Sequence, residues 1–245
     1  MARYKIIVEY VGTNFCGWQR QASGLSVQGL LEEAISKFTN EQVTVTGAGR
    51  TDAGVHAIGQ VAHFDLVKDF TPYTVLRAIN HFLNPNLIAV QECEIVSEDF
   101  HARFSAKRRH YMYRIINREG KLIIDVDRAW QVRQLLDLNK MQQAAHYLIG
   151  EHDFTSFRTV HCQARSPIKT IERIELEKNY NEIRLHISAP SFLHHMVRNI
   201  VGALVKVGVG LLQPEGIKDI LLAKDRSKAP PTAPAHGLYF TKIEY

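Results

Sequence analysis

The stretch that decides how this chain is interpreted is GAGRTDAGVH, residues 47–56. Three glycines fall within eight residues, and glycine permits positive φ and close backbone approach. The spacing therefore predicts a tightly folded loop with Arg50 and Asp52 close together on it. An aspartate that is partly buried and kept ionised by a neighbouring guanidinium is a candidate nucleophile or base. The plainer alternative is that Asp52 caps a turn and Arg50 is a surface arginine.

Two nucleotide-binding patterns come close to this stretch, but each lacks a residue that its chemistry needs. The dinucleotide pattern G-x-G-x-x-G requires glycine where Asp52 stands. A P-loop requires Gly-Lys-Ser/Thr after four spacer residues, whereas Gly54 is followed by Val55 and His56. Without the lysine the triphosphate charge has no partner, and an aspartate inside the loop repels phosphate. The stretch therefore predicts no nucleotide cofactor.

Strand and helix patterns alternate on both sides of this loop, and the same plan occurs twice along the chain. In the first half, period-two patterns predict strands over 5–11, 42–46, 60–65 and 87–96. Helical spacing predicts a helix over 27–38 after the N-cap Ser26, and another that opens at Thr71-Pro72. The second helix is expected to bury one face, made of Leu76, Ile79, Phe82 and Leu83.

The second half repeats the plan with little sequence identity. Strands are predicted over 110–117, 170–177, 182–189 and 238–245. Helices are predicted over about 137–148 and 191–209, with a short one from Pro214. The expected fold is α+β, with two pseudo-repeated α/β halves, 1–105 and 106–245, built from largely antiparallel sheet flanked by helices. That the two halves share one sheet stays open at this point.

Composition limits the function classes. The chain has 245 residues, 45% of them apolar, which is enough to bury a sizeable core. Its net charge of +5 favours a polyanionic partner. No apolar run approaches the ~20 residues of a membrane helix, so no membrane partner is expected. The three cysteines are far apart and form no Cys-x-x-Cys, which predicts reduced thiols and a cytoplasmic protein.

A basic segment with interleaved aromatics starts just before the second half. Residues 101–118 hold six Lys or Arg and no acid. Basic side chains neutralise phosphates and aromatic faces stack on unpaired bases, so the segment is a candidate RNA contact. The candidate cations are Arg103, Lys107, Arg108 and Arg109. The alternative is a solvated basic strand.

The stretch FLHHMVRNIVG, residues 192–202, is the third feature. Arg198 stands among apolar residues, and a buried charge requires a partner, for which Asp52 is attractive. The adjacent histidines His194 and His195 would point about 100° apart on a helix, and no third ligand stands at a telling spacing. They are therefore interpreted as structural or RNA-contacting, and no metal site is predicted.

Four long stretches, in order, resemble the tRNA pseudouridine synthase A family: GAGRTDAGVHAIGQVAHF, DFHARFSAKRRHYMYRI, GEHDFTSFR and FLHHMVRNIVG. The resemblance extends from Tyr10 to Tyr239 and is weaker over 119–135. It implies the pseudouridine synthase fold and conversion of uridine to pseudouridine at tRNA positions 38, 39 and 40, without cofactor or metal. It also implies a homodimer with tRNA lying across both subunits.

The resemblance also implies residue roles. Asp52 matches the family's catalytic aspartate, with Arg198 and Arg50 as the arginines beside it. Tyr111 matches the tyrosine that stacks on the target uracil. Attack at C6, attack at C1′ and loss of the C2′ proton to form a glycal all stay open, and Tyr111 is a candidate base for the C5 proton. The alternative from another class is a non-catalytic tRNA-binding protein that assists RNA folding.

Overall fold

The computed structural model describes residues 1–159, 162 and 164–245, which divide into two compact units. Unit 1 consists of residues Met1–Lys107 together with Tyr239–Tyr245, and unit 2 of Arg108–Leu238. Both units combine helices with a mostly antiparallel sheet, so the expected α+β class is confirmed. Among the described residues, no helix is both long and apolar enough to cross a bilayer.

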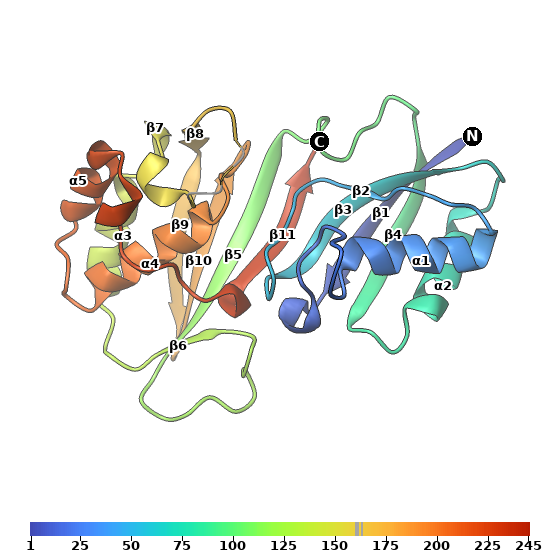
Figure 1. Cartoon of the computed structure of the whole chain (residues 1–245). Coiled ribbons are helices and arrows are strands. Elements are labelled where there is room, and N and C mark those ends of the chain that lie inside the picture. Colours follow the sequence, from blue (N-terminus) through green and yellow to red (C-terminus); the bar gives the residue numbers. More distant parts are fainter. Residues whose placement is uncertain (160–161, 163) are drawn as a thin grey trace. The chain divides into compact units, whose positions relative to one another are not determined.

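Unit 1 is built from four main strands and two helices (Figure 1). Strand β1 pairs antiparallel with β3 and β4, β2 pairs antiparallel with β3, and β11 pairs in parallel with β3. The elements are β1 (Ala2–Tyr10), η1 (Gly12–Asn14), α1 (Val27–Thr39), β2 (Thr46–Gly47), β3 (His56–Leu66), α2 (Pro72–Leu83), β4 (Ile88–Val96) and β11 (Leu238–Glu244).

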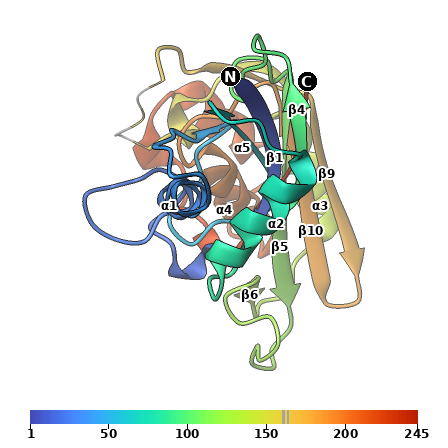
Figure 2. The ribbon, with the colours of Figure 1, turned by 90° about the vertical axis from the view of Figure 1, so that its right-hand side faces the viewer.

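The two helices of unit 1 cover one face of its sheet. Figure 2 shows α1 and α2 on the same side of β1 and β4. Side chains alternate between the faces of a strand, and on β1 every second residue is buried: Tyr4, Ile6, Val8 and Tyr10.

Both helices begin where the sequence predicted. The Ser26 hydroxyl accepts the Gly29 N–H, and the Thr71 hydroxyl accepts the Thr74 N–H. The inner face of α2 differs from the expected one. It is formed by Val75, Ile79 and Leu83, whereas Phe82 is exposed.

The main strands of unit 2 pair antiparallel in the order β5-β10-β9, and β6 is added in parallel to β5. A separate antiparallel pair joins β7 and β8. The elements are β5 (Arg108–Asn117), β6 (Trp130–Val132), α3 (Leu138–His146), β7 (Gly150–Asp153), η2 (Thr155–Phe157), β8 (Ile168–Ile171), β9 (Arg173–Asn179), β10 (Glu182–Ala189), α4 (Met196–Gly208), α5 (Gly216–Ala223), η3 (Arg226–Lys228) and η4 (Ala235–Gly237).

Helix α4 forms the centre of unit 2. Eleven of its residues are buried, as expected for a helix that is apolar on nearly every side. It packs against α3 and η2. The sequence placed its start near residue 191, but the helix begins at Met196, because His195 has a φ of 64° and cannot continue it.

The last strand differs from the expected domain plan. The sequence assigned residues 238–245 to the second half. In the structure, β11 pairs with β3 through Tyr239 and Phe240, so residues 239–245 belong to unit 1. Unit 1 is therefore assembled from two separate parts of the chain.

Candidate active site

Asp52 stands at the start of a tight turn that leads into β3. The carbonyl of Asp52 accepts the N–H of Val55, 3.1 Å away. Gly54, at the third position of this turn, has a φ of 79°, as a type II turn requires. The side chain of Asp52 is half-buried. The glycine of the quoted stretch is thus needed for the turn that presents the carboxylate.

The residue before Asp52 is held on both of its sides. The Thr51 carbonyl accepts the N–H of Trp18 at 3.1 Å. Its hydroxyl lies 2.7 Å from the hydroxyl of Tyr10, in a buried contact. Thr51 is itself buried, so these bonds are shielded from water. The backbone that carries Asp52 therefore has little freedom to move.

The loop over residues 12–18 lies directly against the turn. Gly17 has a φ of 112°, and a Cβ placed there would be 2.6 Å from the carbonyl oxygen of Thr51. The N–H of Gly12 donates to Nδ1 of His56 at 3.0 Å, in the interior. His56 is the last residue of the quoted stretch, so its ring ties the end of the turn to the beginning of this loop.

Strand β11 supports the same turn from another part of the chain. The ring of Phe240 lies against Gly49. The ring of Tyr239 packs on His56, with centroids 4.7 Å apart. The side-chain amide of Gln60 on β3 donates to the Gly49 carbonyl at 2.9 Å. Strands β11 and β3 thus both help to fix the loop from residue 47 to residue 56.

The other candidate of this loop, Arg50, lies differently. Its side chain is exposed, and it forms no ion pair within the described part of the chain. The contacts that fix the turn of Asp52 are made by the backbone and by buried side chains. Arg50 makes none of them and lies at the surface.

Tyr111 lies on β5 of unit 2, opposite Ile187 of β10. Its ring meets that of Phe192 edge to face, with centroids 5.1 Å apart. Two residues along the strand, Tyr113 is fully buried and donates to the Pro234 carbonyl at 2.7 Å. Burial raises the pKa of the Tyr113 hydroxyl above its usual value. Of the two tyrosines, Tyr111 is the less buried.

Arg198 lies in the first turn of α4. Its Nε donates to the Ala233 carbonyl at 2.8 Å, and its own carbonyl accepts the Ala233 N–H at 3.1 Å. This pair of bonds fixes the direction in which the guanidinium leaves the helix. The pairing of Arg198 with Asp52 stays a prediction.

The two histidines precede α4, where the sequence had placed them on the helix. His195 occupies the N-cap position in left-handed conformation, and the His194 and His195 rings have centroids 4.2 Å apart. The expected angle of about 100° between them therefore does not apply. His194 is exposed and His195 half-buried.

The four candidate cations of the basic segment fall into two classes. Arg108 forms an ion pair with Glu172, and Arg109 donates to the Pro190 carbonyl at 2.6 Å. Arg103 and Lys107, in unit 1, are exposed. Lys107 forms no ion pair with any described residue. Arg103 and Lys107 therefore present their charges at the surface.

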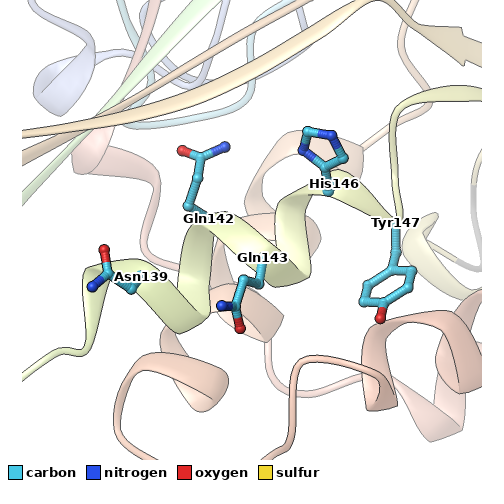
Figure 3. A pocket seen from close by; sticks show the side chains of 5 residues that line it. All are labelled: Asn139, Gln142, Gln143, His146 and Tyr147. Carbon is cyan, nitrogen blue, oxygen red and sulfur yellow. The ribbon is translucent and has the colours of Figure 1, made fainter.

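An open hollow of about 670 Å³ lies along α3 (Figure 3). Five polar side chains from one face of the helix and its C-cap line it: Asn139, Gln142, Gln143, His146 and Tyr147. None of them is among the residues that the sequence singled out, and the hollow contains no carboxylate.

The chemistry that this arrangement permits follows from the turn. A half-buried carboxylate on a rigid backbone is placed in advance, so a substrate that meets it loses little further entropy in the attack. Sequence reasoning missed the residues that hold the turn, namely Tyr10, Gly17, Thr51 and His56. The glycine spacing of residues 12–24 was the available signal for a second loop packed against the first.

Comparisons with known proteins agree on one family. Residues 6–105 and 144–245 match the family model described as tRNA pseudouridine synthase. The chain is 50% identical to "tRNA pseudouridine synthase A" of Orientia tsutsugamushi (strain Ikeda) and 49% identical to the protein of that name from strain Boryong. Both comparisons cover 100% of each chain.

A search of solved structures also gave a match. It is a chain in the crystal structure of a Cbf5-Nop10-Gar1 complex, with a TM-score of 0.41 and 11% identity. The match covers 97% of this chain, which spans about half (48%) of that one.

Proposed function

This chain belongs to the tRNA pseudouridine synthase family, and on that basis we propose that Asp52 is the residue that attacks the substrate. The reaction is the isomerisation of uridine in tRNA: the bond from N1 to C1′ breaks, a bond from C5 to C1′ forms, and the C5 proton leaves while N1 gains one. We further propose that the uridines stand at tRNA positions 38, 39 and 40.

The observation that carries the proposal is the set of hydrogen bonds that fix the backbone at Asp52. Its backbone turn is closed on Val55 and fixed through Thr51 to Trp18 and Tyr10. Fixing the backbone in this way costs conformational entropy, and an ordinary surface turn forms without it. Such rigidity is expected where a nucleophile must meet a reacting atom within a few tenths of an ångström.

Roles for the two arginines follow from their surroundings. The bonds between Arg198 and Ala233 aim the guanidinium, which suits a residue that keeps a carboxylate ionised. Arg50 is exposed and next but one to Asp52, which suits contact with RNA close to the reacting nucleotide. Both arginines and Asp52 lie within the residues that match the family model.

Tyr111 is proposed as the residue on which the target uracil stacks. Its edge-to-face contact with Phe192 holds the plane of the ring. It lies between the two matched ranges, so this role rests on the resemblance of the stretch DFHARFSAKRRHYMYRI. Attack at C6, attack at C1′ and a glycal are all compatible with these positions, and the Tyr111 hydroxyl is a candidate base for the C5 proton.

The surroundings of the reaction are part of the proposal. A homodimer with tRNA across both subunits is proposed from the resemblance, and the reaction is proposed to need no cofactor. A cytoplasmic location is supported by Cys16, Cys93 and Cys162, which are all free thiols.

The test measures tritium release from tRNA labelled at C5 of its uridines, because forming pseudouridine expels the C5 hydrogen. Wild type should release tritium from the anticodon arm, and Asp52→Asn should release none while still binding tRNA. Asp69→Asn removes the same charge at an exposed site of unit 1 and should behave as wild type. Appreciable product from clean Asp52→Asn would remove Asp52 from the nucleophile role. A folded wild type that binds tRNA without release would favour the non-catalytic binding protein.

A further inference from the structure

Three aromatic rings form a column in unit 1 that ends at the surface. His63 of β3 is buried, and its ring centroid lies 4.9 Å from that of His101. The ring of His101 lies against Phe104, with centroids 4.3 Å apart and planes tilted by 36°. Phe104 is 76% exposed. A large apolar ring is thus supported from within and presented to solvent.

The loop that carries Phe104 is fixed by hydrogen bonds to its own backbone. Nδ1 of His101 accepts the N–H groups of Arg103 and Phe104, both at 3.2 Å. The Ser105 N–H donates to the His101 carbonyl, and the Ser105 hydroxyl accepts the His101 N–H. This reciprocal pairing closes residues 101–105 into a compact turn.

The turn is also anchored to the rest of unit 1. The Ala102 N–H donates to Nδ1 of His63 at 3.2 Å, and the Ala102 carbonyl accepts the Tyr245 hydroxyl at 2.9 Å. Ala102 is fully buried. Phe104 therefore stands on a rigid base, and a partner that meets it need not order the loop first.

The charged side chains of the loop that carries Phe104, residues 101–107, are positive. The guanidinium carbon of Arg103 lies 5.6 Å from the centre of the Phe104 ring. Lys107 follows on the same loop and is exposed, and residues 101–107 contain no acid. An exposed ring flanked by cations is the combination that binds unpaired nucleotides, because the ring takes the base and the cations take the phosphates. An apolar protein surface would offer no negative charge to Arg103 and Lys107.

We propose that Phe104, backed by His101, is a stacking surface for an unpaired base of the tRNA other than the uridine that reacts. The proposal rests on the proposed function for the identity of the RNA and for the assignment of the reacting base to Tyr111. It adds a second aromatic contact, which would hold the anticodon arm while the first base is turned out.

The test compares three substitutions at Phe104, which is exposed, so each variant should fold as wild type does. Phe104→Ala and Phe104→Leu should each weaken tRNA binding on the order of 10-fold, the size of one base–aromatic stack. Phe104→Trp should bind at least as tightly as wild type. The introduced indole should be quenched by tRNA, measured above the background of Trp18 and Trp130 in wild type.

Two controls separate stacking from charge. Phe104→Ala should leave unchanged the slope of log Kd against log salt, because the ring neutralises no phosphate. A fully paired RNA duplex offers no free base, so wild type and Phe104→Ala should bind it equally. Thermal unfolding of each variant should match wild type.

The proposal is overturned if Phe104→Ala and Phe104→Leu bind tRNA as wild type does and the introduced indole is not quenched. It is also overturned if Phe104→Ala changes only self-association in sedimentation, which would assign the ring to a contact with a second copy. Tritium release by wild type is measured separately, so a quenched indole in a protein without turnover would support the stack while refuting the proposed function.

Discussion

The Tyr10 hydroxyl lies 2.7 Å from Oγ1 of Thr51, so a side chain of β1 is bonded to the residue directly before Asp52. Both residues are buried, and burial raises the pKa of Tyr10, so its hydroxyl stays protonated. We expect Tyr10→Phe and Thr51→Val each to lower the free energy of unfolding by about 1 kcal/mol. Turnover should fall in both, because the backbone of Asp52 loses a support, while the Kd for tRNA stays constant.

A double-mutant cycle checks this relationship. If the bond is what matters, the Tyr10→Phe/Thr51→Val double variant loses less turnover and stability than the sum of the two single variants. Strictly additive losses would show that each side chain acts through other neighbours.

Gly17 is the second support that can be tested alone. Gly17→Ala places a Cβ at 2.6 Å from the Thr51 carbonyl oxygen and forces an L-residue to a φ of 112°. We expect a loss of about 2–3 kcal/mol in unfolding free energy and a large fall in kcat. Gly210→Ala is the matched control: its φ is 79°, but no atom lies within 4 Å of the new Cβ. It should cost about 1 kcal/mol and leave kcat intact. Equal effects on kcat would contradict a role for the Gly17 contact.

The basic segment should contribute unequally to the salt dependence of tRNA binding. Lys107 is exposed and unpaired with described acids, whereas Arg108 is paired with Glu172. Lys107→Ala should therefore reduce the slope of log Kd against log salt by roughly 0.7–0.9, the value for one phosphate. Arg108→Ala should reduce it by less. A larger change for Arg108 would mean that the ion pair opens when RNA binds.

His63 should make stability depend on pH. Burial, followed by the charges of His101 and Arg3, lowers its pKa to about 4. An unfolded histidine titrates near 6.5, so the unfolded chain takes up a proton first as the pH falls. The stabilising contribution is therefore complete above pH 6.5 and is lost between pH 6.5 and pH 4.

Chemical denaturation at several pH values measures this effect. Between pH 7 and pH 5, the free energy of unfolding should fall by about 1–2 kcal/mol more in wild type than in His63→Asn. The other titrating groups are the same in both proteins, so their contributions cancel in this difference. Asparagine retains an acceptor for the Ala102 N–H, so the loop should stay in place. Parallel curves for the two proteins would contradict the titration of His63.

The sequence predicts those parts of the fold that depend on residues close together in the chain, such as helix caps. Helices α1 and α2 begin at the predicted residues, because Ser26 and Thr71 cap them through bonds to residues three positions away. Strand β10 has the predicted bounds. The start of α4 was wrong, because nothing in the sequence shows that His195 adopts a positive φ.

The features that the sequence did not predict depend on contacts between residues far apart in the chain. Strands β6 and β7 are too short to show alternation, and the predicted strand over 170–177 is interrupted at Glu172 between β8 and β9. The loop that carries Asp52 was found from its glycines. Its supports, Tyr10 and Thr51, are 41 residues apart, and their meeting depends on the pairing of β1 with β3.

The pairing of β11 with β3 has a consequence for protein synthesis. Residues 1–107 emerge from the ribosome well before residues 239–245, yet Tyr239 and Phe240 pack on His56 and Gly49. The nascent chain can therefore build most of unit 1 early, but the turn of Asp52 lacks two of its neighbours until β11 is translated. A chain that stops short of β11 would carry all of residues 47–56 and still lack these two neighbours, so the proposed role of Asp52 depends on synthesis that reaches β11.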